Sequence, residues 1–141
     1  MNITKRIKEL SEFLNCDKDE ISVSTYDENL FEYGNQEYLV LTDTEADNYA
    51  ANYIKDTLWA FNAEFIIDEC TLNPECADSI RVMQERCCES CNSLILAIIE
   101  GSCGIDAFVE DAIRADGRGH YITQYDGHEN ETDNYYIYRI N

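Results

Sequence analysis

The stretch EYLVLTDTEADNYAANYI, residues 37–54, changes from a strand pattern to a helix pattern within a few residues. Its first six residues, EYLVLT, are rich in β-branched, aromatic and aliphatic side chains and predict a strand. Thr42 and Glu45 follow at the spacing of a capping box, in which the Thr hydroxyl and the Glu carboxylate each satisfy a backbone N–H at a helix start. A strand that leads directly into a helix indicates a chain that mixes both elements.

The residues before this stretch predict a helix and a small meander. An apolar residue recurs at helical spacing over 1–15, which predicts an amphipathic helix. The segments EISVSTYD (20–27), NLFEYGNQ (29–36) and EYLVLT alternate like short antiparallel strands. Gly34-Asn35 is the expected turn between the last two. We therefore expect strands within 20–42.

The residues after it predict helices over 43–115. The first should continue through Phe65, because the apolar period persists. Asn73-Pro74 is a second start signal and predicts one long helix to about Glu100, where Gly101 follows. A shorter helix over 105–114 should end at Gly117, a residue that readily adopts positive φ.

The C-terminal part predicts a hairpin over 119–141. HYITQY and NYYIYRI read as strands, and the polar loop DGHENETDN separates them. Gly119 would permit a sharp entry into the first strand, and Asp126-Gly127 would form a turn. Together these elements predict a single α+β domain over 1–141, with the N-terminal and C-terminal strands in one antiparallel sheet and helices covering one face.

The charge of the chain is unusual. It has 29 acidic and 10 basic residues, a formal net charge of −19, yet 11% of its residues are aromatic, which is typical of a folded protein. Fifteen acids and one base lie between Asp19 and Ile80. Such a charge disfavours direct contact with nucleic acid or an anionic membrane and favours a partner with a basic groove.

The start of the chain predicts a cytoplasmic protein. Polar residues interrupt the apolar ones over 1–15, so we expect no cleaved leader, and no apolar run has the length of a membrane span. The seven cysteines are therefore expected to be mostly free thiols.

Three blocks carry a resemblance to a known group of proteins: LTDTEADNYAANYIKDTLWAFNAEF (41–65), DGRGHYITQYDGHENE (116–131) and YYIYRIN (135–141). Together they resemble small acidic proteins encoded by bacteriophages and prophages, a group without an assigned reaction. The resemblance implies a phage setting inside a bacterial host cell. By analogy, some small acidic phage proteins are anti-CRISPR or anti-restriction inhibitors.

The GRGH stretch has two interpretations. In the functional one, Arg118 binds a phosphate or carboxylate, His120 acts as acid or base, and Asp126 orients it, with His128 nearby. In the structural one, Gly117 ends a helix, Gly119 permits the sharp turn into a strand, and Arg118 pairs with local acids. No nucleophile stands at a diagnostic spacing, so we favour the structural interpretation and expect no enzyme.

Two groups of residues also have a metal interpretation. His120, Asp126 and His128 are suitable ligand types but match no standard spacing, and the acidic loop tip lacks the ligand positions of a calcium site. A zinc site or a redox site is the other interpretation, and its residues would be Cys87, Cys88 and Cys91, with Cys70 and Cys76. We expect instead that Cys87 and Cys91 lie on an apolar helix stripe as core residues, and we expect no metal and no cofactor.

The tyrosines of the terminal segment allow either an aromatic contact surface or ordinary strand packing, which we favour. The contact surface would suit a homodimer, as in a structural phage accessory protein. These residues are Tyr121, Tyr125, Tyr135, Tyr136 and Tyr138.

The function that uses the unusual charge is inhibition by mimicry of nucleic acid. Carboxylates grouped on one face would imitate phosphates and occupy the basic groove of a host nucleic-acid-targeting complex. We expect the acids of the second helix to share its outer side. The alternatives are a ligand-binding or hydrolytic domain built on Arg118, His120 and Asp126, and the homo-oligomeric accessory protein. The partner-binding residues of the mimicry hypothesis are Asp27, Glu28, Glu32, Glu37, Asp43, Glu45, Asp47 and Asp56.

Overall fold

The structure is a computed structural model that describes residues 3–141. The first two residues of the helix expected over 1–15 lie outside this range. The chain divides into two compact units. The sheet unit contains the chain up to Ala50 and again from Arg118 to Asn141, and the helical unit runs from Ala51 to Gly117. The predicted α+β class is confirmed.

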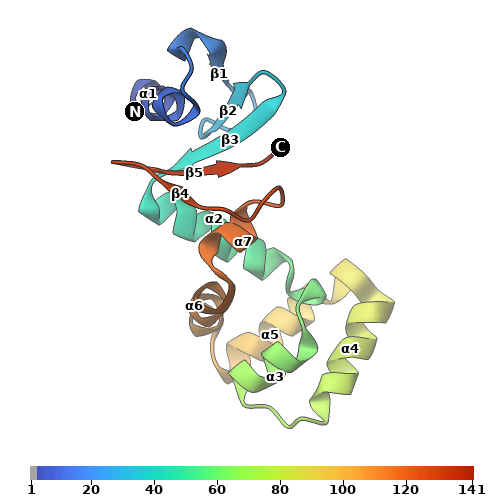
Figure 1. Ribbon diagram of the computed structural model, residues 1–141. Coiled ribbons are helices and arrows are strands. Elements are labelled where there is room, and N and C mark those ends of the chain that lie inside the picture. The colour runs from blue at the N-terminus through green and yellow to red at the C-terminus, as the bar shows by residue number, and fades with distance from the viewer. Residues whose placement is uncertain (1–2) are drawn as a thin grey trace. The chain divides into compact units, whose positions relative to one another are not determined.

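A five-stranded antiparallel sheet forms the centre of the sheet unit, with the strand order β1-β2-β3-β5-β4 (Figure 1). The N-terminal meander and the C-terminal strands therefore join one sheet, as predicted. Gly34 has a φ of 62° at the turn between β2 and β3, the conformation that favours glycine. The strands are β1 (Ile21–Val23), β2 (Leu30–Tyr33), β3 (Gln36–Leu41), β4 (Asn130–Glu131) and β5 (Tyr136–Arg139).

Helices cover both faces of this sheet, whereas the sequence predicted helices on one face. On one face, Leu10 of α1 (Ile3–Leu14) packs with Phe31, Val40 and Ile137. The other face packs against α2 (Asp43–Asp56) and the short α7 (Arg118–Ile122) through a second cluster. That cluster is built on Leu39, Leu41, Ala46 and Tyr138.

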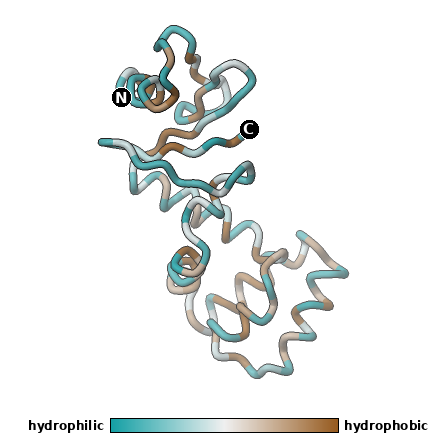
Figure 2. Tube along the Cα trace, viewed as in Figure 1, coloured by the Kyte–Doolittle hydropathy of each residue, from teal (hydrophilic) through white to brown (hydrophobic). Residues whose placement is uncertain are grey.

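The central strand β3 explains why two helical layers are needed. Four consecutive residues of β3, from Tyr38 to Leu41, are buried, although neighbouring strand residues point to opposite faces. Such a strand must be covered on both sides. Figure 2 shows hydrophobic residues along β3. Burying side chains of this size contributes roughly 1.5–3 kcal/mol each.

The helical unit is built around buried aliphatic residues and a cluster of three phenylalanines. The ring centroids of Phe61, Phe65 and Phe108 lie 5.4–6.2 Å apart. After the last part of α2, its elements are η2 (Leu58–Ala60), α3 (Ala63–Cys70), α4 (Cys76–Cys87), η3 (Cys88–Cys91), α5 (Asn92–Ser102) and α6 (Ile105–Asp116).

Two predicted helices are broken. The first ends at Asp56, and α3 starts anew at Ala63, where Asn62 caps it by accepting from Phe65 N. The helix expected from Asn73-Pro74 to Glu100 begins at Cys76 and stops at Cys88, whose φ of 49° is incompatible with a continuous helix. The helix expected over 105–114 is confirmed, and Gly117 ends it with a φ of 87°.

The strand predicted in HYITQY is wrong. Residues 118–122 form α7, so the hairpin contains only β4 and β5. Gly119 does not lead into a strand; it allows a close approach, because a Cβ there would lie 2.5 Å from the Gly127 carbonyl oxygen.

Among the described residues, no single helix is long and apolar enough to cross a membrane. Residues 76–102 and α6 pass that test only as a pair, bent by 100° at their junction.

Candidate functional site

Glu32 and Glu37 form a like-charge pair on the sheet. They are directly opposite each other in the β2–β3 register and therefore project from the same face. Glu32 is exposed and Glu37 is half-buried. Neither carboxylate makes a hydrogen bond or ion pair with another described residue. Two carboxylates so placed repel each other, which costs stability.

The connection between β1 and β2 carries two more of the predicted acids. Asp27 accepts from Asn29 N at 2.8 Å and from the hydroxyl of Tyr49 on α2. Burial and the hydrogen bond to Asp27 raise the pKa of Tyr49. Asp27 is therefore a structural acid of the loop, whereas Glu28 is exposed and, within the described chain, has no partner for its carboxylate.

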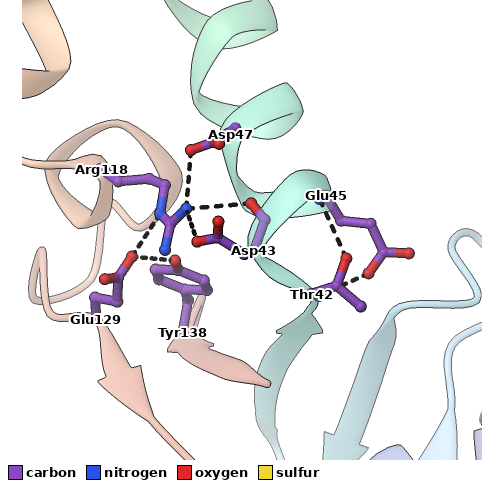
Figure 3. A network of polar contacts seen from close by, with 7 residues as sticks. All are labelled: Thr42, Asp43, Glu45, Asp47, Arg118, Glu129 and Tyr138. Carbon is purple, nitrogen blue, oxygen red and sulfur yellow. Dashed lines mark hydrogen bonds and ion pairs between the residues drawn. The ribbon is translucent and has the colours of Figure 1, made fainter. Parts of the chain in front are cut away.

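Arg118 is the centre of an ion-pair network (Figure 3). Its Nη1 donates to the Oδ1 atoms of Asp43 and Asp47, both at 2.8 Å, and its Nε donates to Oε1 of Glu129 at 2.7 Å. The hydroxyl of Tyr138 donates to the same Glu129 oxygen. The guanidinium also lies 4.6 Å from the centroid of the Tyr136 ring, so it is held by charge and by a cation–π contact.

This network keeps Arg118 charged in a largely buried position. Burial alone would lower the pKa of Arg118, but hydrogen bonds to Glu129, Asp43 and Asp47 outweigh it and the pKa is raised. The Arg118 side chain is 11% exposed. Its partners come from the first turns of α2 and from the segment before β4, so Arg118 fastens α7 to both.

Glu45 has a different structural role. Its Oε1 accepts from the Thr42 backbone N at 2.8 Å, and Thr42 Oγ1 accepts from Glu45 N, so the predicted capping box is confirmed. Glu45 also accepts from both terminal nitrogens of the buried Arg6 on α1, at 2.7 and 3.1 Å. Burial would raise the pKa of Glu45, but the bonds from Arg6 and Thr42 lower it.

The prediction that the acids of α2 share one outer side of the helix is therefore wrong. Asp43 and Asp47 face Arg118, and Glu45 faces Arg6. Asp56 is exposed at the end of α2. Of the eight predicted partner-binding acids, the four whose carboxylates have no partner in the described chain are Glu28, Glu32, Glu37 and Asp56.

The residues of the alternative ligand loop are held by separate local contacts. Arg118 is occupied by its three acids. Asp126 accepts from the backbone N of His128 at 3.0 Å, so it supports its own turn, in which Gly127 has a φ of 69°. His120 stacks edge-on against Tyr121 with ring centroids 4.9 Å apart. Both histidines are exposed. The helix end at Gly117 and the ion pairs of Arg118 match the structural interpretation of the GRGH stretch, whereas the strand that it placed after Gly119 is wrong.

The cysteines are free thiols, and their burial differs from the prediction. Cys91 is buried as predicted, and burial raises its pKa. Cys87, predicted in the core, is exposed together with Cys88, because α4 ends at Cys87 and the predicted continuous helix that would have extended the apolar stripe to Cys91 does not form. Within residues 3–141, no group of three or more His, Cys, Asp or Glu side chains is arranged to hold a metal ion.

Three of the five terminal tyrosines belong to the core. Tyr121, Tyr135 and Tyr138 are buried, and Tyr136 lies under Arg118. Tyr125 is 53% exposed and packs against the guanidinium of Arg139. The aromatic residues thus form core and cation–π contacts in place of a continuous surface.

A pocket of about 360 Å³ in the helical unit had no counterpart in the sequence predictions. Its lining residues come from α4, from α5 and from the segment after α3. The prediction of one continuous helix over 73–100 concealed the pocket.

Comparison of the chain with models of protein families, with curated proteins and with solved structures finds no match.

Proposed function

We propose that the protein binds a basic surface of a bacterial nucleic-acid-targeting complex, of the CRISPR or restriction type, and blocks it in the host cytoplasm. In this proposal the carboxylates of the sheet unit take the place of phosphates. The phage setting comes from the sequence resemblance, and the charge of −19 supports the choice of a basic partner. The proposal includes no catalysis, no cofactor and no direct contact with nucleic acid.

The observation that carries the proposal is the pair Glu32 and Glu37. Directly opposed carboxylates without a counter-ion destabilise a sheet, and an oppositely charged residue at either position would remove that cost. Local violations of stability rules are expected where a surface has a function. Opposed residues have Cβ atoms about 5 Å apart, so the two carboxylates concentrate negative charge at one place on the sheet.

The free carboxylates, and not the paired ones, should contact the partner. Asp43, Asp47 and Glu129 are already attracted to Arg118, so their field outside the protein is partly cancelled. Glu28, Glu32 and Glu37 have no counter-ion among the described residues, so their carboxylates are available to a cation of the partner. Binding through exposed charges should weaken as salt rises.

The test is a pull-down with the tagged protein from a bacterial lysate that contains CRISPR effectors and restriction enzymes. One nucleic-acid-binding complex should be captured, and both high salt and excess duplex DNA should release it. The triple variant Glu28→Gln, Glu32→Gln, Glu37→Gln should lose capture.

A matched control removes the same charge from α3 and α6 of the helical unit: Asp68→Asn, Asp106→Asn, Glu110→Gln. All three residues are exposed, and no described residue pairs with their carboxylates. The control should keep most of the capture. Capture of nothing by the folded protein, or equal loss in both triple variants, would contradict the proposal.

A further inference from the structure

The pocket of the helical unit is apolar. It is lined by Leu72, which follows α3, by one side of α4 and by Ile98 of α5. The α4 residues are spaced three and four apart, so they project from one side of the helix. They are Cys76, Ser79, Ile80 and Met83.

Apolar side chains continue from the pocket onto the surface. Ile98 is 37% exposed, and Leu94, one turn before it on the same side of α5, is 58% exposed. Soluble proteins expose single apolar residues routinely, but a group beside an apolar pocket is typical of a binding surface.

The charge around the pocket determines which partner can cover it. Residues 51–117 contain thirteen acidic and four basic residues. Arg81, beside Ile80, is already paired with Glu64 and Asp78. A second copy of this chain, or an anionic lipid surface, would be repelled. A segment with lysine and arginine beside its apolar residues would be attracted.

We propose that this pocket docks a basic amphipathic helix of a partner protein, whose apolar side chains enter between α4 and α5 while its cations face the surrounding acids. A helix suits the site because its residues at positions i, i+3, i+4 and i+7 form a narrow apolar stripe that fills such grooves. The inference rests on the proposed function in one respect, the basic character of the partner.

The test uses two fluorescein-labelled peptides of identical Leu and Lys composition. One has its leucines in a helical stripe, and the other has them scrambled, so both have the same charge. In fluorescence polarisation at physiological salt, the striped peptide should bind at least ten-fold more tightly. Leu94→Asp and Ile98→Asp should each remove that difference. Ser93→Asp, an exposed position on the same helix, adds the same charge and should preserve it.

Equal binding of the two peptides, or unchanged binding by the Leu94 and Ile98 variants, would overturn the inference. So would a dimer in analytical ultracentrifugation that dissociates in both variants, or binding to anionic vesicles in place of the peptide. Circular dichroism verifies that each variant is folded. If both peptides bind equally while the acidic triple variant still loses its target, this inference alone fails. If the striped peptide docks but the pull-down captures nothing, the proposed function alone fails.

Discussion

Arg118 Nε lies 2.7 Å from Oε1 of Glu129, and the same guanidinium reaches Asp43 and Asp47 on α2. Removing it would leave three carboxylates close together without their cation. We expect Arg118→Ala to reduce the free energy of unfolding of the sheet unit by about 3 kcal/mol. Arg118→Lys should give an intermediate loss, because an ammonium keeps the charge but not the planar fork of donors.

Urea denaturation measures this loss, and Arg114→Ala is the control. Arg114 pairs with Asp111 on one helix and is 72% exposed, so its removal should change the free energy by less than about 0.5 kcal/mol. Similar small effects for both variants would show that the Arg118 network contributes little to stability.

Glu45 should make stability depend on pH. Its pKa is lowered from the usual 4.5 when the protein folds, so the folded state binds fewer protons than the unfolded state near that pH. The contribution of Glu45 is present above the unfolded pKa and is lost as the pH falls through the folded pKa. We expect Glu45→Gln to cost about 2 kcal/mol at pH 7, and this difference from wild type should shrink steadily below pH 4.5.

The comparison with wild type is needed because acidification also relieves the repulsion among 29 acids. Denaturation curves of both proteins between pH 3 and 7 give the difference directly. A difference that is constant over this range would contradict the role assigned to the Arg6–Glu45 pair.

Local signals in the sequence predicted the parts of the fold that are stabilised locally. The capping box at Thr42 and Glu45 and the glycine turn at Gly34 depend on residues within a few positions of each other. The β3 pattern predicted a strand, but it could not show that helices cover both faces. The second face is covered by α2 together with α7, and the sequence did not predict α7.

Long-range contacts account for the rest. Tyr, Ile and Thr in residues 121–123 favour strands, yet this segment begins in a helix whose Arg118 binds acids 71 and 75 positions earlier. The break before α5 is likewise held by Asn92, which donates to Lys55 O and accepts from Trp59 N. The partners of the acids could not be read from charge patterns, so paired and free carboxylates looked alike in the sequence.

Gly119 should be intolerant of any side chain. A Cβ at this position would lie 2.5 Å from the Gly127 oxygen and 3.1 Å from the Glu129 nitrogen, both backbone atoms that cannot move cheaply. We expect Gly119→Ala to reduce the free energy of unfolding by about 2 kcal/mol.

Gly101 provides the control, because it lies in α5 and, apart from its chain neighbours and the backbone of its own helix, no atom lies within 4 Å of its Cβ position. Gly101→Ala should be neutral or stabilise the helical unit by up to about 1 kcal/mol, since alanine is the better helix former. Thermal and urea denaturation of both variants test this, and equal effects would refute the steric argument.

Cys70 and Cys103 are positioned to form a disulfide under oxidation. Their Sγ atoms are 3.2 Å apart, at the end of α3 and just after α5. With oxidised glutathione, one thiolate attacks the reagent and releases one reduced glutathione. The second thiolate then displaces the other, so two protein thiols become one disulfide. Burial, and the hydrogen bond with Cys70, raise the pKa of Cys103 to about 11, so the reaction should be slow at pH 7 and faster at pH 9.

The measurement uses a variant in which Cys16, Cys76, Cys87 and Cys88 are serine, which removes the more accessible thiols. Its mass should fall by about 2 Da as two hydrogens are lost, and the proteolytic peptides containing Cys70 and Cys103 should be linked. The bond closes a loop between residues 33 positions apart and should stabilise the helical unit by about 3–4 kcal/mol. The same variant with Cys70→Ser should keep its mass and its stability. A stable mixed disulfide with glutathione at Cys103 would instead mean that the two sulfurs do not meet in solution.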